Sequence, residues 1–268
     1  MPFLGKKTLE LWSAILRWKD KKFLRKNSDF KNIFSGKRCF VVATGPSIKN
    51  QNLKKLKGEI VISVSNFFVH PDFREISPEF HLFVPSHPPV TPEQYGAWFK
   101  EAEEIFPAGQ KVLISITDKP IVEKFQAFKN QKVYYYRSGH KPLSPETEID
   151  FTRSLPVIQT SVHIGIFLAF YAGAKEIYLL GCDHDWILHL NQTRHFYDEK
   201  ESKLSNLKYN EWEGKDLEVE FQSYVNLWKI YKKIRKYAGK RDVSITNATD
   251  GGLLDVFPRL PLNEVIDA

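Results

Sequence analysis

Short apolar runs alternate with polar or amphipathic stretches along most of the chain. The apolar runs are rich in β-branched and aromatic residues and are bounded by Gly, Pro, Asn and charged residues, a pattern typical of buried strands. They occur at 39–43, within 59–69, and at 80–85, 111–116, 132–137 and 242–247, with helical or irregular stretches such as 92–104 and 121–129 between them. Because alternating strands and helices form parallel sheets, the pattern predicts an α/β protein with helices on both faces of the sheet.

The stretch 159–186 combines an apolar helix, a glycine turn and a buried strand, and it ends on Asp183, His184 and Asp185. Ligands of open α/β sheets bind beyond the carboxyl ends of the strands. These three residues are therefore candidate catalytic groups. The alternative is a charged surface loop.

Two further strands end in polar groups. Thr44, Gly45, Pro46 and Ser47 follow the run 39–43. Glycine permits a sharp turn and close approach to a ligand, proline fits a first helical turn, and serine caps it. This sequence predicts a phosphate cradle at a helix amino terminus, although it lacks the lysine of a P-loop and the three-glycine dinucleotide fingerprint.

The strand within 59–69 stops at Ser65–Asn66. An Asn amide at a strand end can donate to and accept from a nucleobase or a ribose. An asparagine that only shapes a turn is the competing interpretation.

In their order along the chain, these motifs resemble the bacterial lipooligosaccharide sialyltransferases (glycosyltransferase family 42) and the related MptE-like proteins, which include a pterin pyrophosphokinase. The resemblance runs from about Lys37 to Asp185, and the block 160–183 is its most specific part. It implies a Rossmann-like, mostly parallel sheet that binds a cytidine nucleotide at these strand ends. It also implies a CMP-activated acidic sugar, such as sialic acid or a relative, as the donor.

By position, the resemblance assigns the turn after the first strand and Asn66 to nucleotide binding. It places the phosphate or the donor sugar at the Thr160–Ser161 pair, and Asp183 at the strand end of the site. The chain departs from the sialyltransferases at Thr44, where they have Asn. Arg153 and the residues that follow it stand where those enzymes have phosphate-binding tyrosines. The expected nucleotide-binding residues are Thr44, Gly45, Pro46, Ser47, Asn66, Thr160 and Ser161.

Glycosyl transfer needs a base for the acceptor hydroxyl, and histidine suits that role. His195 and His184 lie nearest in sequence to the expected site. Of the two, His195 is better placed, with Asp198 nearby to orient its ring. His163 falls on the apolar helix and is interpreted as structural. Arg153 is a further candidate for the leaving phosphate.

Asp183 and Asp185 also allow a different chemistry. Two carboxylates at a strand end can hold Mg²⁺ or Mn²⁺ on a diphosphate. The alternatives are therefore an MptE-like metal-dependent pyrophosphokinase and a metal-dependent glycosyltransferase that uses a nucleoside diphosphate sugar. A CMP-sugar carries one phosphate, so under the first hypothesis no cofactor and no metal site are expected.

The charge is concentrated near the amino terminus. The 268 residues carry a net charge of +7, and residues 1–26 hold eight Lys or Arg against two acids. Their Leu, Ile, Trp and Phe residues fall mostly on one half of a helix, so the segment 1–30 is expected to be a basic amphipathic helix. Such a helix suits the surface of an anionic membrane. Packing on its own domain or on a dimer partner is the alternative.

The composition is that of an ordinary globular enzyme, with 42% apolar and 26% charged residues. Neither a spanning segment nor a signal peptide is evident, so we expect a cytoplasmic protein at the inner face of the cytoplasmic membrane. Expected partners are a nucleotide-sugar donor and a surface glycan or glycolipid acceptor, with a homo-oligomer possible. Nucleic acid is not expected, because the chain beyond residue 26 is nearly neutral.

Residues 31–268 are expected to form one nucleotide-binding catalytic domain. The polar stretch at about 187–220 interrupts the alternation and is expected to be an acceptor-binding lid, with a merely solvated loop as the alternative. Its aromatic side chains could stack on sugars. Phe221, Tyr224, Trp228 and Tyr231 recur at helical spacing and are expected to lie in the core.

Overall fold

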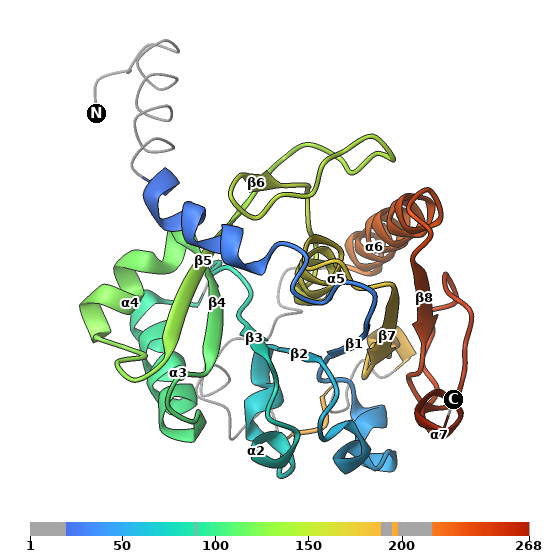
Figure 1. Ribbon diagram of the computed structural model, residues 1–268, viewed down its shortest axis with the longest axis horizontal. Coiled ribbons are helices and arrows are strands. Elements are labelled where there is room, and N and C mark those ends of the chain that lie inside the picture. Colours follow the sequence, from blue (N-terminus) through green and yellow to red (C-terminus); the bar gives the residue numbers. More distant parts are fainter. Residues whose placement is uncertain (1–19, 89, 189–194, 198–215, 268) are drawn as a thin grey trace.

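The fold is built on one sheet of parallel strands (Figure 1). The computed structural model describes residues 20–88, 90–188, 195–197 and 216–267. Within them, eight strands follow the order β6-β5-β4-β3-β2-β1-β7-β8, and every neighbouring pair is parallel. The strands are β1 Arg38–Val42, β2 Val61–Val64, β3 Phe80–Leu82, β4 Lys111–Ser115, β5 Lys132–Ser138, β6 Ser154–Leu155, β7 Glu176–Leu180 and β8 Ser244–Asn247.

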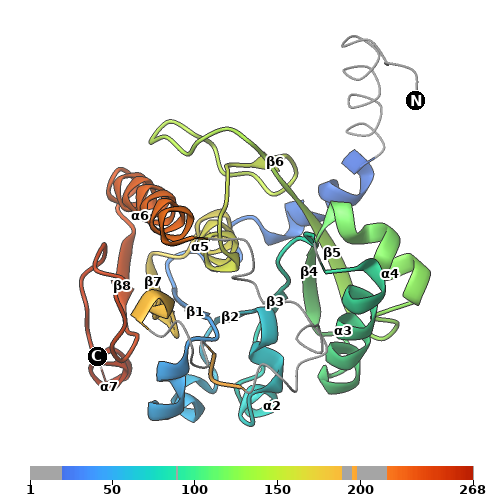
Figure 2. The same cartoon turned by 180° about the vertical axis from the view of Figure 1, so that it is seen from behind.

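Helices cover both faces of the sheet, as the alternation of elements predicted (Figures 1 and 2). The α-helices are α2 Phe73–Ile76, α3 Pro92–Ile105, α4 Lys119–Phe125, α5 Ser161–Tyr171, α6 Leu217–Gly239 and α7 Leu262–Ile266. Short 3₁₀ turns are η1 Arg25–Phe30, η2 Pro46–Asn50, η3 Leu53–Leu56, η4 Ser65–Val69, η5 Ile116–Asp118 and η6 Trp186–Leu188.

Strand β1 lies inside the sheet and is apolar on both sides. Cys39 and Val41 face the layer that contains α5 and α6, whereas Phe40 and Val42 face the layer that contains α3 and α4. Successive side chains of a strand point to opposite faces, so a strand covered on both faces must be apolar throughout. This explains the continuous apolar runs in the sequence.

Helix α5 is buried almost all round, which explains why its sequence is apolar on every side. Gly165 is required by close packing, because a Cβ there would lie 2.8 Å from Cγ1 of Val41 on β1. At the amino terminus of the helix, the Thr160 hydroxyl accepts a hydrogen bond from the Val162 N–H. The helix is thereby pressed against the centre of the sheet with its first turn at the carboxyl ends of the strands.

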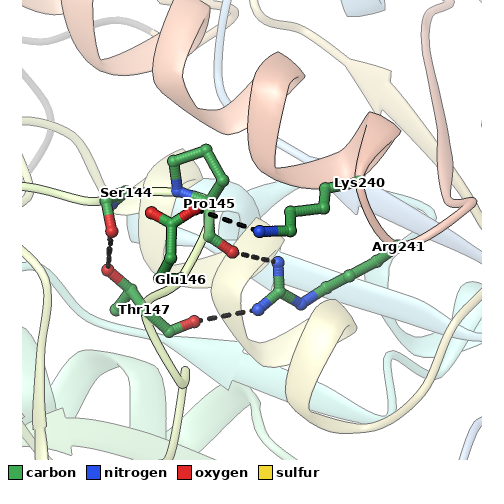
Figure 3. A network of polar contacts seen from close by, with 6 residues as sticks. All are labelled: Ser144, Pro145, Glu146, Thr147, Lys240 and Arg241. Atoms are coloured by element: carbon green, nitrogen blue, oxygen red, sulfur yellow. Dashed lines mark hydrogen bonds and ion pairs between the residues drawn. The ribbon is translucent and has the colours of Figure 1, made fainter.

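The carboxyl end of α6 is tied to the loop between β5 and β6 (Figure 3). The Arg241 guanidinium donates to the carbonyls of Pro145 and Thr147 at 2.9 and 3.0 Å. Lys240 pairs with Glu146 at 3.0 Å, and the Arg241 guanidinium also lies 3.5 Å from the centre of the Tyr237 ring. These contacts fix the middle of the loop that leads through β6 to the first turn of α5.

The segment 20–30 belongs to the folded domain. Leu24 and Phe30 are buried, and the Asn27 amide donates to the carbonyls of Tyr135 and Phe151 at 2.7 and 2.9 Å. Residues 1–19 of the expected amphipathic helix lie outside the described residues. Among the described helices, none is long and apolar enough to cross a membrane.

The expectation that the aromatic stripe of α6 lies in the core was wrong at its first position. Tyr231 is fully buried, but Phe221 is 57% exposed. Leu217, Val219 and Val225 in the first turns of α6 are also exposed, so helical spacing there does not imply burial. Strand β6 was not predicted, because its two residues are too few to give a pattern.

Replacing Gly165 with Ala should destabilise the fold, because the added methyl meets a stiff, buried Val41 side chain. We expect a loss of about 1–2 kcal/mol, in the range typical of overpacked cores, measured by urea unfolding. Gly239→Ala is the matched control, since a Cβ at that helix position meets nothing within 4 Å. Equal stability of the two variants would contradict this packing argument.

Candidate active site

A cavity of about 420 Å³ opens beyond the carboxyl ends of β1 and β7. At these neighbouring strands the chain reverses the direction in which it adds strands to the sheet. Strands β2 to β6 lie on one side of β1, whereas β7 and β8 lie on its other side. Open α/β sheets bind ligands at such a point. The walls are formed by Ala43, Thr44, Gly45, Val64, Ser65, Val84, Gln159, Thr160, Ser161, Val162, Gly181, Asp183, His184, Asp185, Trp186, His195, Glu220, Ser223 and Leu227.

Asp183 holds the turn that follows β1. Its Oδ1 accepts from the Ser47 N–H at 3.0 Å and its Oδ2 from the Ser47 hydroxyl at 2.8 Å. The turn passes so close that a Cβ on Gly45 would lie 1.8 Å from Oδ2 of Asp183. Glycine is therefore required at position 45 by steric contact with the carboxylate.

The Asp183 carboxylate is largely removed from water. Burial raises its pKa, while the two hydrogen bonds from Ser47 act in the opposite direction and lower it. With both oxygens accepting from Ser47, the carboxylate ties the segment after β7 to the turn after β1.

His195 reaches the site on the far side of the same turn. Its Nδ1 lies 3.1 Å from the Thr44 hydroxyl, and the next residue, Phe196, donates its N–H to the Thr44 carbonyl at 3.0 Å. Phe196 is buried against Phe67, and the His195 ring stacks on Tyr197 with centroids 4.9 Å apart. The structure thus brings His195 and Thr44 together at the cavity wall. Asp198 lies outside the described residues.

The first turn of α5 forms the opposite wall. Thr160 and Ser161 line the cavity, and the Ser161 hydroxyl lies 3.2 Å from that of Ser65. Ser65 has φ +53, a left-handed conformation that ends β2 and turns the chain. Hydroxyl groups beside a helix amino terminus can bind an anionic ligand.

Asn66 lies elsewhere. Its side chain is buried, it does not belong to the cavity wall, and its Oδ1 accepts from the Trp98 indole N–H of α3. Its assignment to nucleotide binding stays a prediction, and the geometry gives the amide a structural contact. Pro46 also lies outside the wall, where it starts the turn that carries Ser47.

The two remaining members of the acid–imidazole cluster line the cavity in different ways. His184 adopts a left-handed conformation with φ +47, and its Nε2 lies 2.7 Å from the Tyr231 hydroxyl of α6. Burial lowers the pKa of His184 to about 4, so the ring is neutral near pH 7. Asp185 lines the cavity, whereas Arg153 is exposed and pairs with Glu148 and Asp150.

His163 is fully buried, as the structural interpretation predicted. Its Nδ1 accepts from the Gln159 N–H at 3.2 Å, and its ring packs edge-on against Tyr231 with centroids 4.5 Å apart. Burial lowers its pKa well below the usual value, with a smaller contribution from His184.

Three polar wall residues were not identified from the sequence. The Gln159 amide donates to the carbonyl and the hydroxyl of Ser223 at 2.8 and 3.0 Å, which joins α5 to α6. Glu220, buried in the first turn of α6, accepts from the Trp186 indole at 3.4 Å. Gln159 and Ser223 lie 64 positions apart along the chain, and no local pattern marks them as neighbours.

The charge of the wall limits what it can bind. It carries Asp183, Asp185 and Glu220, and the wall residues within the described chain include no Lys or Arg. Among the described residues, no three His, Cys, Asp or Glu side chains are grouped to hold a metal ion. Both Asp183 oxygens accept from Ser47, so a Mg²⁺ or Mn²⁺ ion between Asp183 and Asp185, the alternative drawn from the sequence, would have to share those oxygens with Ser47.

Fold and cavity define a Rossmann-like α/β protein with its ligand site at the reversal point of a parallel sheet. Residues 18–187 match the family described as 6-hydroxymethylpterin diphosphokinase MptE-like, and the chain belongs to that family. The resemblance to MptE-like proteins inferred from the motifs is thereby confirmed. No curated protein matches the chain.

Solved structures similar to the chain include the sialyltransferase CstII from Campylobacter jejuni in complex with a substrate analogue, cytidine-5'-monophosphate. It is 17% identical, with 85% of this chain and 86% of that chain covered and a TM-score of 0.44. The sialyltransferase CST-II in complex with a trisaccharide acceptor and CMP is also 17% identical, with 85% and 87% covered and a TM-score of 0.42.

Replacing Ser47 with Ala should destabilise the protein by about 1–3 kcal/mol, since it leaves a buried carboxylate oxygen without its donor. The pKa of Asp183, already raised by burial, should rise further. An acid whose pKa is higher in the folded state than in the unfolded state binds more protons when folded. The protein therefore loses stability as the pH rises from the unfolded-state pKa to the folded-state pKa. The penalty should therefore be larger near pH 7 than near pH 4.

Urea unfolding of Ser47→Ala at both pH values checks this expectation. Ser244→Ala serves as the control, because Ser244 is an exposed residue of β8. A penalty that is the same at both pH values would mean that Ser47 does not act through the charge of Asp183.

Proposed function

We propose that the protein is a glycosyltransferase that takes a sugar from a CMP-activated donor, such as CMP-sialic acid or a relative. The observation that supports this best is a wall that, in the described chain, has no Lys or Arg. A triphosphate or diphosphate carries several negative charges and calls for cations or a metal. The phosphodiester of a CMP-sugar carries a single negative charge, separate from the carboxylate of an acidic sugar, and neutral donors can hold it.

In this proposal the nucleotide lies across the ends of β1 and β7, with its phosphate toward the hydroxyls of Thr160 and Ser161. The acceptor hydroxyl attacks the anomeric carbon, the bond from that carbon to the phosphate oxygen breaks, and CMP leaves with the bonding electron pair. His195 takes the proton of the attacking hydroxyl. Its contact with the Thr44 hydroxyl, at 3.1 Å, orients the ring, and in this proposal Nε2 accepts the proton while Nδ1 carries the hydrogen.

The diphosphokinase described for the family is the second candidate, because family membership itself favours it. It would transfer a pyrophosphoryl group from ATP to a small alcohol. The two candidates differ in the nucleotide that binds and in the need for Mg²⁺, so binding separates them.

The first test is a thermal-shift series with CMP, CDP, UDP, GDP and ATP, each with and without Mg²⁺. We expect CMP to raise the melting temperature independently of Mg²⁺, because a ligand at about 100 times its Kd stabilises the folded state by about 2.7 kcal/mol. A shift that requires both ATP and Mg²⁺ would overturn the glycosyltransferase proposal in favour of the diphosphokinase.

The role of His195 is tested with His195→Ala once a CMP-sugar is found to bind. Release of CMP from the donor, in the presence of acceptor or by transfer to water, should slow by about 10²- to 10⁴-fold, while the CMP thermal shift persists. His140→Ala is the control, since His140 is exposed in the loop between β5 and β6. An unchanged rate for His195→Ala would exclude it as the base.

We further propose that the acceptor is a surface glycan or glycolipid and that the enzyme works at the inner face of the cytoplasmic membrane. The basic amino-terminal segment supports this part, with eight Lys or Arg within residues 1–26. Because Leu24 is buried and Asn27 is bonded to the domain, attachment would depend on the residues before position 20.

Deleting residues 1–19 tests this attachment without removing any residue that the structure describes. The truncated protein should lose sedimentation with vesicles that contain anionic lipid, and should keep its melting temperature. Equal sedimentation of the full chain and the truncated chain would show that the segment does not bind the membrane.

A further inference from the structure

We propose that His184 presents a neutral Nδ1–H group to the cavity as a hydrogen-bond donor for an anionic group of the substrate, and that Tyr231 fixes the ring in this tautomer. The identity of the anion, the phosphate of a cytidine nucleotide, rests on the proposed function. The tautomer of His184 and the contact that fixes it do not depend on the proposed function.

The contact between His184 and Tyr231 determines where the ring proton lies. The Tyr231 side chain is fully buried, and its hydroxyl lies 2.7 Å from His184 Nε2. No other hydrogen-bond partner of this hydroxyl occurs among the described residues. If Nε2 carried the proton, the buried Tyr231 O–H would have no acceptor there, at a substantial cost in free energy. The favoured arrangement has Tyr231 donating to Nε2, so that the proton of the neutral ring lies on Nδ1.

The surroundings keep both side chains neutral. Burial raises the pKa of Tyr231 well above its ordinary value, and burial lowers the pKa of His184 to about 4. The His184 ring is packed against the rings of Trp186, Trp228 and Tyr231, with centroids 5.5 to 6.3 Å apart.

The titratable neighbours do not reverse this state. His163 faces Tyr231 from α5 and is itself held neutral by burial. In the chain, His184 is flanked by Asp183, whose carboxylate is bonded to Ser47, and by Asp185 on the cavity wall.

The position of His184 suits an anion. It lines the same cavity wall as Thr160 and Ser161. His184 and His163 of α5 both contact Tyr231. With Nε2 engaged, Nδ1 is the ring nitrogen without a partner among the described residues. The described wall has no Lys or Arg, so neutral donors must balance a bound phosphate, and an N–H group beside the first turn of α5 adds one.

The backbone supports the same interpretation. His184 has φ +47, a conformation that most residues with a side chain adopt only at a cost. That strain places the ring between the cavity and α6 directly after the bonded Asp183. Asn tolerates this conformation and carries an amide N–H near the position of Nδ1, whereas Ala does neither.

The tautomer is tested first by ¹⁵N NMR of the full chain labelled in histidine, with His184→Asn used to assign the His184 signals. We expect a protonated Nδ1 and an unprotonated Nε2 that do not titrate between about pH 6 and pH 8. Tyr231→Phe should release the ring into a mixture of tautomers. A proton on Nε2, or a charged ring at neutral pH, would overturn the proposal whether or not the protein binds a nucleotide.

The donor role is tested by calorimetric titration with CMP. His184→Ala should weaken CMP binding by roughly 10- to 100-fold, the range expected for the loss of a hydrogen bond to a charged group, and Tyr231→Phe by less. His184→Asn should restore most of the affinity. Tyr237→Phe, a change of the same kind further along α6, should leave it unaltered.

Equal CMP affinity in His184→Ala and the unchanged protein would refute the donor role. If the unchanged protein binds no CMP, the proposed function fails, and inorganic phosphate replaces CMP as the probe. Phosphate should then shift the His184 Nδ1 signal, and a signal that stays fixed at saturating phosphate would likewise refute an anion-binding role.

Discussion

The bidentate contact between Asp183 and Ser47 is the interaction on which the site depends. It joins the segment after β7 to the turn after β1, through two residues 136 positions apart in the chain. A carboxylate buried beside the backbone of that turn loses its hydration, and the N–H and O–H of Ser47 replace it. Gly45 is then obligatory, because any side chain would occupy the space of the carboxylate.

This contact also organises the opposite side of the turn. Thr44, one residue before Gly45, receives the Phe196 N–H on its carbonyl and lies within hydrogen-bond distance of His195 through its hydroxyl. A short turn thus positions a carboxylate on one side and an imidazole on the other. Since the turn itself is held at the centre of a parallel sheet, this part of the cavity wall is positioned by buried strands.

Helix α6 contributes Glu220, Ser223 and Leu227 to the wall. It also explains why the neighbouring residues Asp183 and His184 have different roles. Asp183 faces the turn after β1, whereas His184 faces Tyr231 on α6. Neighbouring residues in the chain therefore have different roles, because a left-handed residue reverses the direction of the side chain at position 184. The network at Arg241 fixes the far end of the same helix and so the position of Tyr231 along it (Figure 3).

The sequence by itself determined the strand–helix alternation, the parallel sheet and the strand ends at which the cavity forms. These features follow from local properties: apolar runs, glycine turns and polar groups at run ends. The sequence could not distinguish a polar residue that lines the cavity from one that is hydrogen-bonded elsewhere. Asn66, which accepts from the indole of Trp98, is an example. The tertiary structure alone decided that Asp183 bonds to Ser47, that Gln159 bonds to Ser223 at the cavity, and that Phe221 is exposed. Those outcomes depend on which distant segments pack together, and the pairing of segments far apart along the chain leaves no periodicity in either of them.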